Sequence, residues 1–266
     1  MADGVPRGDE GRQPGGGPRD EPGGQMTLLD HLDELRSVLV QSLIAVGLAS
    51  IVCWFLSRPL LDLLVQPLTG SGNMVYFHQP VEAFLTRMKL AVVCGLFLVL
   101  PFVLVRAYRF VLPGLYAKER RAVTPLLFAS VILFYTGVAF AYLVLIPKVM
   151  AFMLNYATTY MQPLIGIGPY FAFVARLCLA FGLVFELPLV ILLLSSLGVV
   201  SPRALWKGWR YALLAIVVMS ALLTPPDVFS QIVMAGPVML LYLGSVGVAL
   251  VVEKRRGDGE LPGDDD

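Results

Sequence analysis

Residues 26–56 read MTLLDHLDELRSVLVQSLIAVGLASIVCWFL, a charged amphipathic segment that runs straight into a long apolar stretch. Leucines recur at spacings of four, three and four residues, which places them on one helical face: Leu28, Leu32, Leu35 and Leu39. Thr27 is a suitable N-cap for this helix, with the Asp30 carboxylate in its first turn. The sequence therefore predicts an interfacial helix that leads into a first membrane span at 38–56.

Composition assigns the whole chain to the membrane. Of its 266 residues, 57% are hydrophobic and only 15% are charged, and the mean hydropathy is +0.76. Soluble domains have a smaller apolar fraction and about 25% charged residues. The formal net charge of +1 identifies no partner, so the placement of the charges carries the information.

Further apolar stretches predict five more spans, at 83–105, 122–146, 169–194, 211–223 and 228–252. We expect Arg58 and Pro59 to end the first span and Pro147 to end the third, because proline interrupts a helix. Two extracytoplasmic caps then remain, at 60–79 and 148–168, each with turn-forming residues.

The fifth apolar stretch is shorter than the about 20 residues that a membrane span needs. We expect its polar flank at 206–210 to continue the helix and the bilayer to thin locally. A re-entrant hairpin of the last two stretches is the alternative, but basic residues at both outer ends of the pair favour two crossings. The predicted fold class is an all-α polytopic membrane protein with six transmembrane helices, of which helices five and six are short.

The six helices form one membrane domain, which we assign to 26–256. The preceding segment 1–25 is rich in Gly and Pro, and the tail 257–266 is acidic, so both are expected to be disordered.

Lysines and arginines are distributed unequally between the two sides of the predicted spans. One side has only Arg58, Arg87, Lys89 and Lys148. The side of the N-terminus has many more: Arg36, Arg106, Arg109, Lys118, Arg120, Arg121, Arg203, Lys207, Arg210, Lys254, Arg255 and Arg256. The positive-inside rule therefore places both termini in the cytoplasm, N-in/C-in, in agreement with an even number of spans.

Sequence motifs of common enzymes are missing from the chain. It contains no GxxxxGK[ST] phosphate loop, no GxSxG nucleophile elbow and no HExxH metal helix. His31 and His78 are predicted on opposite sides of the membrane, and Cys53, Cys94 and Cys178 lie within apolar spans as core residues. We therefore expect no enzymatic activity, no cofactor, no metal site and no nucleic-acid partner.

Four segments together resemble the TatC family, the polytopic subunit of the twin-arginine protein translocase. They are HLDELR at 31–36, RFVLPGLYAKERR at 109–121, AFGLVFELP at 180–188 and LLTPPDVFSQ at 222–231. The similarity covers 26–256 with matching order, spacing and topology. The chain departs from the family pattern in its extension before Met26 and in Arg176, to which the resemblance gives no role.

The resemblance implies a signal-peptide receptor and core subunit of the translocase, which exports folded proteins across the cytoplasmic (inner) membrane with the proton motive force. It also implies twin-arginine signal peptides as ligands, TatA-like and TatB-like single-span partners, and a homo-oligomer within the complex. No nucleotide is implied.

The resemblance further implies a cytoplasmic signal-peptide site at Glu34, Glu119, Arg36, Leu35, Phe110, Arg120 and Arg121. At helical spacing Asp33 has Arg36 as an ion-pair neighbour, whereas Glu34 has no strong local cation. Carboxylates from two separate segments, Glu34 and Glu119, could hold paired guanidinium groups through bidentate hydrogen bonds. The alternative is that both are ordinary solvated charges at the membrane interface.

The fourth predicted span contains a carboxyl group, that of Glu186, two residues before Pro188. A polar patch that faces partner helices or a water-filled concavity is one interpretation, and a hydrogen bond that stabilises the helix break is the other. Between the last two spans, Asp227 is placed to cap the next helix and Gln231 follows one turn later. Partner contact is the additional role that the resemblance implies for them.

Pro67, Lys89 and Pro113 also match family segments, and loop, snorkelling or packing roles explain them equally well. The main rival function is a proton-coupled secondary transporter that titrates Glu186 and Asp227. Such folds usually have internal repeats and several polar groups at the membrane midplane, and no clear repeat is present here. A membrane scaffold without a transport role is the second rival.

Overall fold

The computed structural model describes the backbone of residues 28–70, 72–111, 120–158, 160, 163–196, 198–224 and 227–258. Side chains are described over the same ranges apart from 28–31, 108–111, 120–124, 126 and 255–258. The segments predicted to be disordered, 1–25 and 257–266, lie outside these residues except for the backbone of 257 and 258. The elements follow in the order α1 (Leu28–Phe55), α2 (Ser57–Thr69), β1 (Val75–Tyr76), α3 (Pro80–Val111), α4 (Arg120–Phe140), η2 (Ala141–Leu145), α5 (Ile146–Leu154), β2 (Ile165–Gly166), α6 (Ile167–Val184), α7 (Leu187–Ser196), α8 (Pro202–Lys207), α9 (Trp209–Leu223) and α10 (Val228–Asp258).

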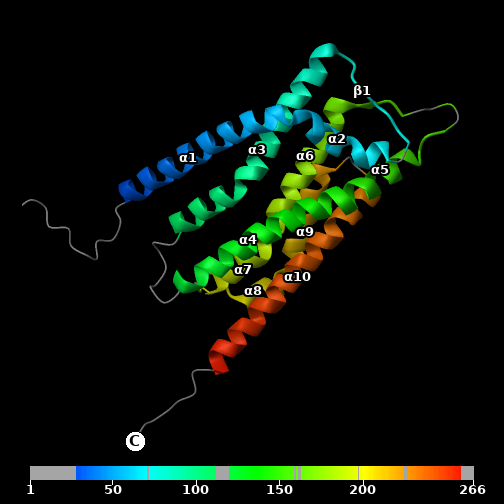
Figure 1. Ribbon diagram of the computed structural model, residues 1–266. Helices are drawn as coiled ribbons and strands as arrows, with labels where there is room; N and C mark the ends of the chain where they lie inside the picture. Colours follow the sequence, from blue (N-terminus) through cyan, green and yellow to red (C-terminus); the bar gives the residue numbers. More distant parts are fainter. Residues whose placement is uncertain are drawn as a thin grey trace, which may run out of the picture.

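The helices lie side by side in an elongated bundle, with α1 and α3 at one edge and α9 and α10 toward the other (Figure 1). One end of the bundle contains the start of α1, the end of α3, the start of α4, α8 and the end of α10. We call this end the terminal face. The opposite end contains α2, β1, β2 and the end of α5, and we call it the cap face.

In the described part of the chain, five helical stretches are long and apolar enough to cross a membrane: Leu32–Phe55, Pro80–Ala107, Leu127–Leu154, Ile167–Ser196 and Val228–Lys254. The shorter apolar helix α9, of 15 residues, is the sixth. The predicted six-helix fold with a short fifth helix is confirmed. The prediction of a short sixth helix is wrong, because α10 has 31 residues and continues past the apolar stretch into its basic end.

The predicted ends of the first and third spans have different outcomes. The first span ends at Phe55, before Arg58 and Pro59 as predicted, and Pro59 lies inside the first turn of the next helix, α2. The third span continues through Pro147, near the start of α5, as far as Leu154. Proline is accepted in the first turn of a helix because the missing N–H would have no helical partner there. The π-helical turn η2 directly before α5 interrupts the regular hydrogen bonding and allows the chain to continue as a helix.

The two caps are joined to each other, which the sequence did not predict. Strands β1 and β2 form a parallel pair, with Val75 opposite Ile165. The Glu82 carboxylate reinforces this junction, since it accepts hydrogen bonds from the backbone amides of His78 (2.8 Å) and Gly168 (3.0 Å). The cap face is therefore one connected structure instead of two independent loops.

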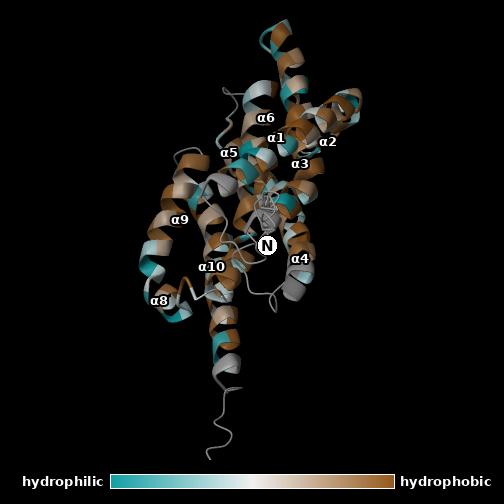
Figure 2. Ribbon diagram, turned by 90° about the vertical axis from the view of Figure 1, so that its left-hand side faces the viewer, coloured by the Kyte–Doolittle hydropathy of each residue, from teal (hydrophilic) through white to brown (hydrophobic). Residues whose placement is uncertain are grey.

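The buried core lies between α2, α3, α6, α10 and the helix formed by α4, η2 and α5. Its largest fully buried side chains include Phe134, Phe181, Leu68, Leu145 and Leu177. The outer surfaces of the helices are also apolar, as the brown ribbons of Figure 2 show, while hydrophilic residues gather around α8. An apolar exterior of this kind is compatible with a lipid environment.

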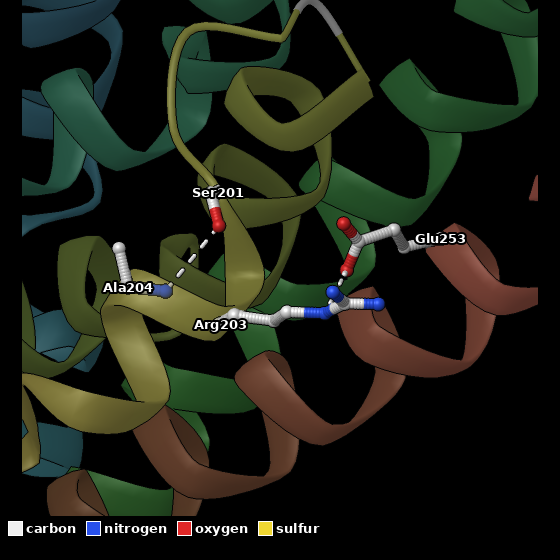
Figure 3. Close-up of polar contacts among 4 residues, drawn as sticks. All are labelled: Ser201, Arg203, Ala204 and Glu253. Carbon is white, nitrogen blue, oxygen red and sulfur yellow. Dashed lines mark hydrogen bonds and ion pairs between the residues drawn. The ribbon is translucent and has the colours of Figure 1, made fainter.

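Figure 3 shows two polar contacts at the start of the short α8, a cap within the helix and an ion pair to α10. The Ser201 hydroxyl accepts a hydrogen bond from the backbone amide of Ala204 at 3.3 Å and so caps α8. Next to it, Arg203 Nε lies 3.9 Å from Glu253 Oε2 on α10. Exposed ion pairs contribute only about 0–1 kcal/mol, so this pair adds little to the stability of the fold.

Candidate functional site

The Glu34 side chain lies on α1 near the terminal face. Helices α1 and α3 run antiparallel (Figure 1), and they approach closely where Ser50 meets Gly95, because a Cβ at Gly95 would lie 2.9 Å from the Ser50 Cα. Glu34 is 16 residues before Ser50, and Val111 is 16 residues after Gly95. The antiparallel register therefore places Glu34 level with the end of α3.

The carboxylate of Glu34 has an unusual environment for a terminal-face charge. Its Oε2 atom is buried and has no hydrogen-bond partner among the described residues. Burial of an oxygen without a donor is unfavourable, so this atom is ready to accept a hydrogen bond from a group outside the described structure. The neighbouring side chains of Asp33, Leu35 and Arg36 are exposed.

The predicted ion pair between Asp33 and Arg36 does not form. Within the described ranges, only Arg203 and Glu253 come within 4.0 Å as an ion pair. The spacing of three residues permits the contact, but an exposed pair gains too little free energy to fix two long side chains. Glu34 has no local cationic partner, as predicted, because it makes no ion pair with any described residue.

The remaining residues of the predicted signal-peptide site are only partly visible. Glu119 and Pro113 lie outside the described residues. The backbones of Phe110, at the end of α3, and of Arg120 and Arg121, at the start of α4, are described without their side chains. These helix ends share the terminal face with Glu34 (Figure 1), but the meeting of the two carboxylates stays a prediction.

Glu186 is buried inside the bundle, with 8% of its surface exposed. It lies in the turn between α6 and α7, which confirms the predicted helix break before Pro188. Ser130 of α4 donates a hydrogen bond of 2.8 Å to Glu186 Oε2. The other oxygen, Oε1, is buried and has no partner among the described residues. One of the two carboxyl oxygens of Glu186 is therefore hydrogen-bonded inside the protein, and the other has no partner among the described residues.

Glycines on α4 and α6 bring Ser130 and Glu186 together. A Cβ at Gly137 would lie within 2.9 Å of the Phe181 carbonyl carbon, and one at Gly182 would lie within 2.7 Å of the Phe134 ring. Because these glycines have no side chains, α4 and α6 pack closely at points one to two helical turns from the hydrogen bond between Ser130 and Glu186. Ser130 could not be predicted from the sequence, because a serine in an apolar span has no distinctive spacing and its partner is 56 residues away.

The turn between α9 and α10 places Asp227 and Gln231 as predicted. Asp227 Oδ1 accepts a hydrogen bond from the Ser230 amide at 2.7 Å and caps α10, while its Oδ2 atom is buried without a partner in the described structure. Gln231 Nε2 donates to the Val217 carbonyl oxygen of α9 at 3.1 Å. These contacts hold the two helices together. Pro225 and Pro226, also in this turn, lie outside the described residues.

Glu186 and Asp227 do not form one cluster. A recess beside the α9–α10 turn is lined by Thr224 together with residues of α6 from Pro169 to Arg176, so the turn lies beside the first part of α6. Glu186 follows Arg176 by ten residues, about 15 Å along a helix. In the described ranges, no three His, Cys, Asp or Glu residues are placed to hold a metal ion.

Two further predicted residues lie near the cap face. Pro67 is inside α2, in a helix instead of a loop. Lys89 is exposed on α3 and lines a recess with His78, Glu82 and Thr86. A snorkelling role of Lys89 stays a prediction.

Comparison with known proteins identifies the family. The profile of the TatC family, described as Sec-independent protein translocase protein (TatC), matches residues 30–237. The chain belongs to the TatC family. A TatC protein of Carboxydothermus hydrogenoformans is 37% identical over 236 residues, which are 88% of this chain and 97% of that protein. A chloroplastic TATC protein of Arabidopsis thaliana is 41% identical over 221 residues, which are 83% of this chain and 65% of that protein.

A solved TatC structure has the same fold. The crystal structure of a TatC protein described as the twin arginine translocase receptor superposes with a TM-score of 0.76 at 32% identity, over 83% of this chain and 98% of that one. These similarities confirm the predicted family, the polytopic all-helical fold and a role in Sec-independent protein translocation. They favour this role over the proton-coupled transporter. The chain is a multi-pass membrane protein of a transport family.

Proposed function

We propose that this TatC-family protein is the receptor for twin-arginine signal peptides, with its terminal face in the cytoplasm and its caps outside the inner membrane. The lysines and arginines of the chain concentrate toward the terminal face, which supports this orientation. The observation that carries the receptor function is the buried Oε2 atom of Glu34, which has no partner among the described residues. The receptor title of the solved TatC structure is consistent with it.

In the proposed site, one guanidinium group of the peptide satisfies Glu34. Arginine presents parallel N–H donors that match both oxygens of a carboxylate, whereas lysine offers a point charge without this geometry. Glu119 follows the end of α3 by only eight residues, so its carboxylate is the second acceptor for the paired arginine. Leu35 and Arg36 on α1, and Phe110, Arg120 and Arg121 at the neighbouring helix ends, complete the contact surface.

Glu34→Gln tests the site, with Asp33→Asn as the matched control on the same helix turn. A hydrogen bond to a charged group contributes about 1.5–3 kcal/mol, so Glu34→Gln should weaken binding of a twin-arginine peptide by at least about tenfold. Asp33→Asn should leave the affinity within about twofold, because the Asp33 side chain is exposed and unpaired in the described structure.

The measurement is photocrosslinking of the membrane-inserted protein to peptides with RR, KK or no basic pair. A preference for RR that disappears in Glu34→Gln and in Glu119→Ala supports the proposal. Equal yields with RR and KK, or an unchanged yield in both variants, would contradict it.

We infer a second role for the intramembrane polar groups, contact with single-span TatA-like and TatB-like partners. The unpaired Oε1 atom of Glu186 supports this role, because a buried acceptor in a membrane protein can accept a hydrogen bond from a polar side chain of another helix. Asp227 and Gln231 are the corresponding groups at the cap-side end. We further propose that export is powered by the proton motive force and that several copies of the chain act in one complex.

The partner role and a purely structural role make different predictions for Glu186. Glu186→Gln keeps a hydrogen-bonding group, whereas Glu186→Leu removes it. If hydrogen bonding to a partner is the function, Gln should preserve co-purification of the single-span subunits and export, and Leu should abolish both while the protein remains inserted. Normal co-purification with Leu would refute the partner role.

A further inference from the structure

Arg176 is a charged side chain that the functions above do not use. It lies on α6, nine residues after Ile167, inside the apolar stretch Ile167–Ser196. The side chain is exposed, and it makes no hydrogen bond or ion pair with any described residue. An arginine within a membrane span is unfavourable unless it reaches water or an anion, so an anion at Arg176 would have to come from outside the described chain.

Arg176 on α6 lies beside the end of the short helix α9. Arg176 lines a recess of about 380 Å³ together with residues of α6 and of the α9–α10 turn: Pro169, Ala172, Phe173, Leu222, Leu223 and Thr224. The recess extends along α6 from Pro169, two residues after the start of the helix, to Arg176, which is nine residues or about 13 Å from that start. The α9–α10 turn therefore lies beside the first turns of α6, and Arg176 is the lining residue of α6 farthest from the start of that helix.

The length of α9 favours a thinner bilayer beside this turn. The 15 residues of α9 extend about 22 Å, whereas the hydrocarbon layer is about 30 Å thick. A membrane helix that is too short is accommodated by local thinning of the bilayer. Thinning at the cap side of α9 brings phospholipid headgroups to the level of Arg176.

The lining of the recess favours a lipid over a soluble anion. Phe173, Leu222 and Leu223 form apolar walls that are suited to acyl chains, and Arg176 is the cation at its edge. The Thr224 hydroxyl donates to the Ser220 carbonyl oxygen and is not free to donate to an anion. One guanidinium beside an apolar surface matches a phosphate group that is attached to hydrocarbon chains.

We propose that Arg176 binds the phosphate of a membrane glycerophospholipid whose acyl chains lie over Phe173 and Leu222. The bound lipid anchors the thinned leaflet at the α9–α10 turn. This site is independent of the signal-peptide site, because Arg176 and Glu34 lie on different helices, one beside the cap-side turn and the other at the terminal face.

The test uses the purified full-length protein, exchanged into nanodiscs and analysed for retained phosphatidylglycerol by native mass spectrometry. Arg176→Gln should lower the occupancy of bound phosphatidylglycerol about tenfold, and Arg176→Lys, which keeps the charge without the fork, should lower it less. The matched control is Arg58→Gln, an exposed arginine in the first turn of α2 at the cap face, which should retain the lipid as the unaltered protein does.

Three results would overturn the proposal. The first is equal lipid retention in Arg176→Gln and Arg58→Gln. The second is displacement of the lipid by millimolar inorganic phosphate, which would identify a simple anion site. The third is a photoreactive residue at position 172 that crosslinks to a protein partner instead of phospholipid. If Arg176→Gln does not fold, the comparison is made with Arg176→Met, which replaces the guanidinium by an uncharged side chain; full lipid occupancy in Arg176→Met would equally refute the role of the guanidinium.

Discussion

The close packing of α4 on α6 can be tested by adding a single methyl group. In Gly137→Ala the new Cβ would meet the carbonyl oxygen of Phe181 and lie 2.8 Å from the Phe185 ring. A side chain can rotate away from such a contact, but the backbone of α6 cannot, so the two helices must move apart. The matched control is Gly236→Ala in α10, where nothing lies within 4 Å of the added atom.

The expected magnitude follows from two opposing contributions. Alanine is favoured over glycine in a helix by about 0.5–1 kcal/mol, and this gain applies to both variants. Overpacking costs about 1–3 kcal/mol and applies only to Gly137→Ala. The free energy of unfolding of Gly137→Ala should therefore be about 1–3 kcal/mol lower than that of Gly236→Ala.

The assay is equilibrium unfolding of the purified protein in mixed micelles, with the thermal midpoint as a second measurement. Gly137 lies about two helical turns from Ser130, so the same variant should also weaken the hydrogen bond between Ser130 and Glu186. Export should fall in Gly137→Ala and not in Gly236→Ala. Equal free energies of unfolding for the two variants, within about 0.5 kcal/mol, would refute the close approach of the helices.

Two further predictions concern buried and cap-face hydrogen bonds. Ser130→Ala removes the donor to Glu186 and should lower the free energy of unfolding by about 1–3 kcal/mol, whereas Ser130→Thr should largely restore it; equal stability of the Ala and Thr variants would contradict this. Glu82→Gln leaves a weaker acceptor for the amides of His78 and Gly168 and should speed their hydrogen exchange. Unchanged exchange would mean that pairing of β1 with β2 alone holds the caps together.

The six membrane helices could be predicted because long apolar runs determine them without reference to the rest of the chain. Their ends were less predictable, as Pro147 demonstrates. A proline interrupts a helix in its interior but fits its first turn, and the sequence around Pro147 does not reveal the π-helical turn that precedes it. The pairing of β1 with β2 could not be foreseen, since two residues per strand give no period to detect.

The features of the candidate sites also differ in how far the sequence alone predicts them. The position of Glu186 at a helix break and the capping role of Asp227 depend on neighbours in the sequence, and the structure confirms both. The contact of Glu186 with Ser130 depends on how two helices pack, which their own sequences do not report. The ion pair of Asp33 with Arg36 was compatible with helical spacing, but spacing permits a contact and does not supply the free energy to form it.

The junction of the two caps has a consequence for the biogenesis of the chain. Glu82 enters the membrane region with the second span, yet one of its two donors, the Gly168 amide, is 86 residues further on. Strand β1 likewise can pair only after β2, at the start of the fourth span, has been synthesised. A nascent chain that has inserted only its first three helices therefore presents an open, incomplete cap to the proteases and chaperones on that side of the membrane. The cap can therefore close only after the fourth helix has begun to insert.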